Sequence, residues 1–86
     1  MDVSQFPDYV CHMQVKAVKI GGISAVLGDP TQFVITPKDT EIRPFYVNGD
    51  YIKKHSPQIG GYVVVLRDGY VSYSPCGLFE QGYSRV

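Results

Sequence analysis

The chain has 86 residues, with eight Lys and Arg against eight Asp and Glu, and 44 % of it is hydrophobic. This length and composition fit one small domain with its own core and exclude a disordered tail. A formal net charge of zero argues against a protein that holds DNA or RNA by neutralising phosphates, and equally against an acidic mimic of nucleic acid. With a pI near 6.7 the chain repels copies of itself weakly, which fits a protein that associates with a partner or forms a homo-oligomer.

The cysteines and the apolar runs indicate the cellular compartment. Cys11 and Cys76 form no CxxC or CxxH pair, so no zinc site is expected, and we interpret both as buried small hydrophobes with reduced thiols. No apolar run approaches the roughly 18 residues of a membrane span. Asp2 stands where a signal peptide needs positive charge. We therefore expect a cytoplasmic protein without a membrane span, a metal or another cofactor.

Two units are expected along the chain. Residues 1–8 form a short N-terminal arm, in which Pro7 prevents regular strand pairing. Residues 9–86 form one globular domain, since they contain no internal repeat and no low-complexity stretch.

The first strand of the domain is predicted from alternation. From residue 9 to residue 17, apolar and polar side chains alternate as in a half-buried strand. The apolar phase changes at Val18 and Ile20, which predicts a β-bulge near Ala17 and Val18. The glycine pair at 21–22 is then expected to loosen or turn the chain.

The middle of the chain predicts an apolar segment, a turn, a strand, a polar connector and a short edge strand, over residues 23–27, 28–30, 32–36, 38–41 and 43–47. A short helix is expected from Gly49 to His55. Asn48 suits the N-cap and Asp50 the positive end of the helix, whereas the basic residues 53–55 suit its negative end. Pro57 forbids continuation.

The clearest pattern is a hairpin in the last third. Residues 62–66 are apolar at every position, which predicts a central strand covered on both faces. Asp68 and Gly69 between two β runs predict a two-residue turn that places Arg67 opposite Tyr70 and able to lie over its ring. This register puts Tyr62, Val64, Leu66, Val71 and Tyr73 on a core face, and Val63, Val65, Arg67, Tyr70 and Ser72 on a mixed face.

A short helix is predicted to follow the hairpin. Ser74 suits its N-cap, Pro75 its first turn, and Gly82 a left-handed residue just past its end. Gly77 costs helix stability, which predicts a close approach of the backbone to the sheet or to a partner. The stripe at helical spacing consists of Cys76, Phe79 and Tyr83. The elements together predict an α+β fold, a small antiparallel sheet of four to five strands with a short C-terminal helix packed on one face.

No residue set in the sequence predicts catalysis. His12 stands alone, without a carboxylate or cysteine at fixed spacing. Ser72 and Ser74 lie in no G-x-S-x-G elbow, and Gly60 and Gly61 precede a strand instead of opening a helix, so neither a serine nucleophile nor a phosphate loop is expected. We therefore predict a protein that is not an enzyme.

The tyrosines point to binding. Seven Tyr and no Trp are more hydroxyl-bearing rings than a small core needs, so some are expected at a contact surface. Tyr70 with Arg67, and Tyr51 with Lys54, are the leading pairs. The basic cluster at 53–55 is either a solvated end of the helix or an anion contact. The candidate binding residues are Tyr51, Lys53, Lys54, His55, Arg67, Tyr70 and Ser72.

The C-terminal string resembles a family of small tailed-phage and prophage proteins. Residues 60–75 read GGYVVVLRDGYVSYSP, followed by Phe79, Glu80, Gly82 and Tyr83. The ends of the family read approximately G-Y-Y-V-V-Y-x-D-G-Y-x-S-(aromatic)-S-P-x-x-x-F-E-x-G-Y. Residues 14–20 and 51–57 resemble the family more weakly. The chain departs from the pattern at Leu66, Arg67 and Gly77.

The resemblance implies a phage accessory protein that acts by binding in the host cytoplasm. The favoured role is antagonism of a host protein or a defence system. The first alternative is a virion or assembly component, and the second is a sponge that sequesters a small nucleotide signal as a homo-oligomer. The expected partner is thus a host or phage protein or a small nucleotide, with no membrane and no direct DNA binding.

Overall fold

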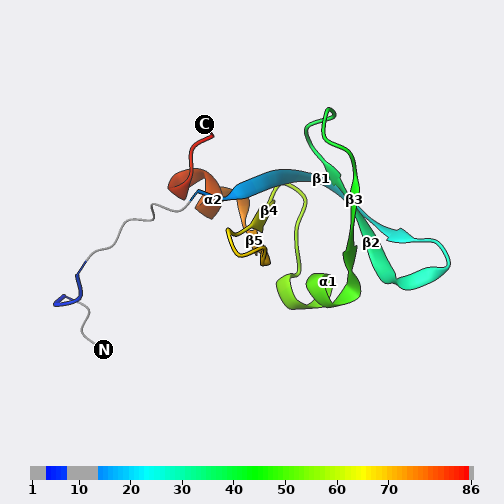
Figure 1. The fold of residues 1–86 in the computed structure, drawn as a ribbon, viewed down its shortest axis with the longest axis horizontal. Helices are drawn as coiled ribbons and strands as arrows, with labels where there is room; N and C mark the ends of the chain where they lie inside the picture. The colour runs from blue at the N-terminus through cyan, green and yellow to red at the C-terminus, as the bar shows by residue number, and fades with distance from the viewer. Residues whose placement is uncertain (1–3, 8–13, 86) are drawn as a thin grey trace.

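In the computed structural model, five strands and two helices make up the described part of the chain, residues 4–7 and 14–85. They are β1 (Lys16–Val26), β2 (Asp29–Pro37), β3 (Phe45–Asn48), α1 (Gly49–His55), β4 (Tyr62–Val65), β5 (Val71–Ser74) and α2 (Cys76–Gly82). Every strand pairing is antiparallel, in the order β3-β2-β1-β4-β5 (Figure 1). The predicted α+β class is confirmed. The alternation predicted from Tyr9, with Cys11 and His12, falls largely outside the described residues.

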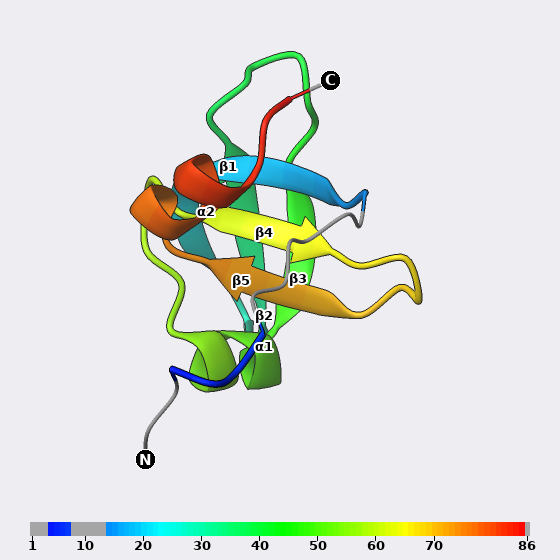
Figure 2. The same ribbon diagram turned by 90° about the vertical axis from the view of Figure 1, so that its left-hand side faces the viewer.

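Strand β1 is shared by two halves of the sheet. Its residues 16–19 pair with β4, whereas its pairing with β2 begins at Ile20. Figure 2 shows β4 and β5 running across the direction of β2 and β3. The sheet therefore changes direction along β1, which makes this strand the centre of the fold.

The bulge in β1 lies at Gly21. The register with β2 shifts between Ile20 and Gly22, and this extra residue lets both Ile20 and Ile23 contact the core. The bulge predicted near Ala17 and Val18 is wrong, because residues 16–19 pair with β4 in unbroken register. The glycine pair continues the strand instead of turning the chain.

The middle of the chain follows the prediction closely. Leu27 and Gly28 form the turn between β1 and β2, with Gly28 at a φ of 83°, so the turn begins one residue earlier than predicted. Strand β2 ends at Pro37 as expected. Strand β3 is an edge strand, as predicted, although it begins at Phe45.

Helix α1 has the predicted bounds. The Asn48 side chain accepts a hydrogen bond from the backbone N–H of Tyr51 at 2.9 Å. Asp50 lies in its first turn and the basic residues 53–55 in its last. The helix ends at Ser56, which adopts the left-handed conformation with a φ of 45°.

The β4–β5 hairpin has a register one residue away from the predicted one. Leu66 pairs with Tyr70, so the turn holds three residues, 67–69, with Gly69 at a φ of 90°. Val63 therefore faces Tyr73, and Val65 faces Val71. The predicted division of faces is wrong as a consequence: Val63, Val65, Val71 and Tyr73 share one face, and Tyr62, Val64, Ser72 and Ser74 the other.

Helix α2 packs on the face of β4 that carries Tyr62. The Phe79 ring stacks on that of Tyr62 with centroids 4.1 Å apart, and Tyr83 stacks on Phe79 at 4.7 Å. The stripe predicted for this helix is thus confirmed, and β4 is covered on both faces, with Val63 and Val64 both buried.

The predicted ends of α2 need correction. Pro75 occupies the N-cap, and Ser74 stays in β5 because a residue before proline favours extended backbone. Gly82 is the last helical residue and has no positive φ. Gly77 faces open space, so the close approach to the sheet that was predicted there is wrong, whereas an approach to a partner stays a prediction.

The core lies between the two halves of the sheet and α1. Ile20, Ile35, Tyr51 and Val63 form its buried cluster. The partly buried side chains packed against it include Phe45 and Tyr73. A core of this size leaves many large apolar side chains of the described residues exposed.

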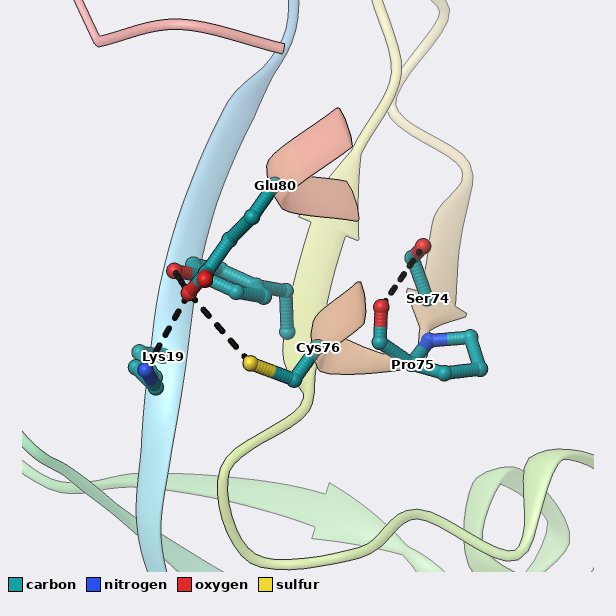
Figure 3. A network of polar contacts seen from close by, with 6 residues as sticks. Lys19, Ser74, Pro75, Cys76 and Glu80 are labelled. Atoms are coloured by element: carbon teal, nitrogen blue, oxygen red, sulfur yellow. Dashed lines mark hydrogen bonds and ion pairs between the residues drawn. The ribbon is translucent and has the colours of Figure 1, made fainter. Parts of the chain in front are cut away.

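Glu80 ties α2 to strands β1 and β4 (Figure 3). Its Oε2 accepts hydrogen bonds from the Tyr62 hydroxyl at 2.7 Å, Lys19 Nζ at 3.1 Å and the Cys76 thiol at 3.3 Å. These hydrogen bonds lower the pKa of Glu80 to about 2, and the same carboxylate raises the pKa of Lys19 and of Tyr62. Cys76 is free, as expected, but only partly buried.

Two glycine substitutions should act in opposite directions. In Gly61→Ala the new Cβ would overlap the Tyr73 ring, which must then move at a cost of roughly 1–3 kcal/mol. In Gly77→Ala the new Cβ meets open space, and the helix gains up to about 1 kcal/mol. Thermal unfolding should show a lower Tm for the first variant and a higher Tm for the second, by roughly 4–8 °C per kcal/mol. Shifts of the same sign would contradict this packing.

Glu80→Gln should make stability less sensitive to acid. A carboxyl whose pKa falls from 4.5 to about 2 on folding stabilises the protein above pH 4.5, and this contribution disappears as the pH falls toward 2. The wild type should therefore have the higher Tm at neutral pH, and the difference should shrink in Tm scans from about pH 5 downward.

Leu78→Gln is the matched control for this series, since Leu78 lies on the same helix and is 68 % exposed. Its Tm should differ from that of the wild type by the same amount at every pH. A Glu80→Gln difference that stays constant into strong acid would show that the carboxylate does not hold α2.

Candidate binding surface

The end of α1 meets the start of β5 at Tyr70. Lys54 Nζ donates a hydrogen bond to the Tyr70 hydroxyl at 2.7 Å and lies 5.1 Å from the centre of the ring. A cation centred above the ring at that distance could not also reach the hydroxyl, so Lys54 holds the hydroxyl end and does not cover the ring. Tyr70 is 43 % exposed. We call these two residues the Tyr70–Lys54 pair.

Local backbone features place both members of the pair. Asp68 Oδ1 accepts a hydrogen bond from the Tyr70 N–H at 2.9 Å, and Gly69 supplies the left-handed residue of the turn. On α1, the Asn48 cap sets the first turn and thereby puts Lys54 in the last. Short-range signals on both elements therefore create this contact between residues 16 positions apart.

Tyr51 lies beneath the pair, in the core. Its side chain is 9 % exposed, and its hydroxyl donates a hydrogen bond to the backbone oxygen of Ser72 at 2.7 Å. Burial raises the pKa of Tyr51 to about 12. The His55 ring lies 4.8 Å from that of Tyr51 and 6.5 Å from that of Tyr70. Tyr51 and Ser72 therefore join α1 to β5, and this contact fixes the relative position of the elements on either side of the pair.

The predicted pairing of Arg67 with Tyr70 is wrong, because the three-residue turn removes Arg67 from the position opposite Tyr70. The cation at Tyr70 is Lys54. Arg67 and Lys53 are both exposed. The structure thus brings together five of the seven predicted binding residues, which are Tyr51, Lys54, His55, Tyr70 and Ser72.

An apolar groove of about 420 Å³, whose lining includes Val71, the residue after Tyr70, lies between the two edge strands of the sheet. We call it the β3–β5 groove. Ile42, Tyr46 and Val71 line it and are 42 %, 68 % and 39 % exposed. Lys16 is the only charged residue that the described part of the chain contributes to its lining. The remaining lining residues are Ala17, Val18, Phe45, Val47, Val63 and Val65.

The sequence analysis missed this groove for a physical reason. Both edge strands, β3 and β5, contribute to it because the sheet changes direction along β1. The sequence pattern of each strand identifies its apolar positions. It does not show that the first and last strands of the sheet, β3 and β5, come close together. A correct hairpin register would have indicated part of the groove, because it places Val71 on the same face as Val65.

A larger hollow of about 1120 Å³ lies beside α2. Lys19, Tyr62 and Glu80 line it, and their polar groups are already bonded to one another. Phe79, which also lines it, is covered on both sides by stacked rings. The lining of the hollow also includes Gln14, Lys38, Asp39, Ser84 and Arg85, so the hollow is more polar than the β3–β5 groove.

Neither a membrane span nor a metal cluster is found in the parts of the chain that the structure describes. No helix within residues 4–7 and 14–85 is long and apolar enough to cross a bilayer. Within the same ranges, no three His, Cys, Asp or Glu side chains gather where they could hold a metal ion. No protein-family model, curated protein or solved structure matches the chain.

Tyr51→Phe should weaken the junction of α1 with β5. Loss of the hydrogen bond to Ser72 should cost about 0.5–1.5 kcal/mol, or roughly 4–8 °C in Tm per kcal/mol. The wild type carries a phenol whose pKa rises from 10.0 to about 12 on folding. Its extra stability is therefore complete below pH 10 and is lost as the pH rises toward 12.

Thermal unfolding of both proteins from neutral pH upward measures this effect. The Tm difference between the wild type and Tyr51→Phe should be constant to about pH 10 and then shrink. Tyr46→Phe is the control, since Tyr46 is 68 % exposed. Equal behaviour of the two variants would mean that the Tyr51 hydroxyl contributes nothing at the junction.

Proposed function

We propose that the protein is a phage-encoded, non-enzymatic binding protein that acts in the host cytoplasm by binding a host protein and antagonising it or a defence system. The Tyr70–Lys54 pair carries this proposal. Tyrosine contributes strongly to protein interfaces because it buries a large, rigid area at low entropic cost. A ring that is already held at its hydroxyl loses less freedom when a partner covers it.

The motif that resembles small phage proteins supports the same surface. Asp68 and Gly69 build the turn, Phe79 stacks on the sheet and Glu80 bonds to it. These motif residues thus have roles within the fold. Tyr70, by contrast, keeps 43 % of its surface in solvent. A role outside the fold accounts better for a tyrosine at this position.

Replacement of Tyr70 should reduce the free energy of binding more than the free energy of unfolding. The exposed hydrogen bond between Lys54 and the Tyr70 hydroxyl contributes only about 1 kcal/mol to stability. Truncation of a tyrosine that dominates an interface costs about 2 kcal/mol or more, which is roughly 30-fold in affinity. A variant can therefore lose its partner and still fold.

Tyr70→Ala should reduce the affinity for the partner by roughly 30-fold or more, with a change in Tm below about 8 °C. Lys54→Ala should have a smaller effect of the same sign, because it frees the ring without removing it. The partner is captured with the tagged chain from lysate of phage-infected bacteria, purified, and titrated against each variant by calorimetry. Arg67→Ala tests the second predicted residue, and Leu78→Ala is the exposed control on α2.

Several results would contradict the proposal. Loss of folding in Tyr70→Ala, without a separable loss of binding, would assign the ring to the fold. Co-purification with phage particles would make the protein a virion or assembly component. A rise in Tm with a cyclic or adenine nucleotide would make it a sponge for a small nucleotide signal.

A further inference from the structure

We infer that the β3–β5 groove receives large apolar side chains of the partner protein, flanked by a carboxylate that pairs with Lys16 in the lining. This inference rests on the proposed function and specifies the chemistry of the partner. It concerns residues outside the Tyr70–Lys54 pair, of which Val71 follows Tyr70 in the chain.

Part of the exposed apolar surface lies at this groove. The described residues expose eight large apolar side chains. Three of them, Ile42, Tyr46 and Val71, line the groove, and Tyr70 precedes Val71 in the chain. Scattered apolar residues are normal on a surface, whereas a contiguous apolar patch marks a site that another molecule covers.

The lining favours a protein segment over a small molecule. A volume of about 420 Å³ falls within the range of ~300–1,000 Å³ typical of ligand sites. Such sites fix a small ligand through several converging polar groups. Among the described residues of the lining, Lys16 alone is charged, and the other side chains except the Tyr46 hydroxyl are apolar. A protein segment can take its orientation from contacts outside the groove, which the Tyr70–Lys54 pair provides.

The charges favour a different protein over a second copy of this chain. Lys16 lies in the lining, Lys54 at Tyr70, and Arg67 in the turn that joins β4 to β5. Asp68 is the acidic residue of that turn, and its Oδ1 is bonded to the Tyr70 N–H. A two-fold interface across the groove would bring this surface, with its cations, against the same surface of a second copy, which is unfavourable. Carboxylates flanking the apolar anchor would instead complement them.

The experiment uses the full chain, immobilised, and a displayed library of random 12-residue peptides. Enriched peptides should combine at least two large apolar residues with a neighbouring Asp or Glu. Synthetic copies of them should lose at least 10-fold in affinity for Val71→Lys and for Ile42→Lys, measured by fluorescence anisotropy. Lys16→Glu should weaken them as well, and more so at low salt than at high salt. Leu78→Lys, which adds the same charge on α2, should bind like the wild type.

Ile42→Lys guards against misfolding, since Ile42 lies in the loop between β2 and β3 and is 42 % exposed. Circular dichroism confirms that each variant folds. Peptides that are basic, that bind Val71→Lys as well as the wild type, or that fail to enrich at all would overturn the inference. A dimer that dissociates in Val71→Lys, seen by sedimentation, would assign the groove to a second copy.

The two proposals can fail separately. If Tyr70→Ala loses the host partner while Val71→Lys and Ile42→Lys retain it, the proposed function stands and the groove inference falls. If the groove variants lose the peptides and the partner while Tyr70→Ala retains both, the groove stands and the Tyr70–Lys54 pair is not the contact.

Discussion

The fold depends on one strand serving two half-sheets. The first residues of β1 pair with β4, and the rest pair with β2 after the bulge at Gly21. A Cβ at this position would lie 3.0 Å from the backbone of Lys38, so a glycine allows the close approach at which the sheet changes direction. In a flat sheet of the same order, β3 and β5 would be the most distant strands. The change of direction brings these edges to one groove.

Helix α1 joins the two halves a second time. It packs against β2 and β3, and the Tyr51 hydroxyl reaches across to the backbone of Ser72 in β5. The last turn of the helix carries Lys54 to the hydroxyl of Tyr70. The candidate surface therefore combines the buried Tyr51 with the exposed Tyr70. Its position is fixed by the core, to which Tyr51 belongs.

Short-range sequence signals such as helix caps and proline stops predict the ends of α1 correctly. The bounds of α1 follow from Asn48, Asp50 and Pro57, since a cap and a stop act within one turn. The hairpin shows the limit of such signals. Asp68 and Gly69 fit a two-residue turn and also a three-residue turn with a left-handed glycine, and the structure has the second.

One residue of register decides the candidate site. It separates Arg67 from Tyr70, moves Val71 to the groove and leaves Lys54 as the cation of the pair. Of the two tyrosines proposed as contacts, Tyr70 is exposed and Tyr51 is buried. The groove and the Glu80 network both join residues far apart in the chain, and Lys19 lies 61 positions from Glu80. Contacts of this kind depend on how the whole sheet bends.

The central claim is that the partner binds across Tyr70 and the β3–β5 groove. The most direct measurement is the backbone NMR spectrum of the isotope-labelled chain during titration with the purified partner. The account predicts the largest shifts and line broadening at Tyr70, Val71, Tyr46 and Lys16, with little change at Leu78 on α2. Changes confined to the hollow beside α2, around Phe79 and Glu80, would contradict it.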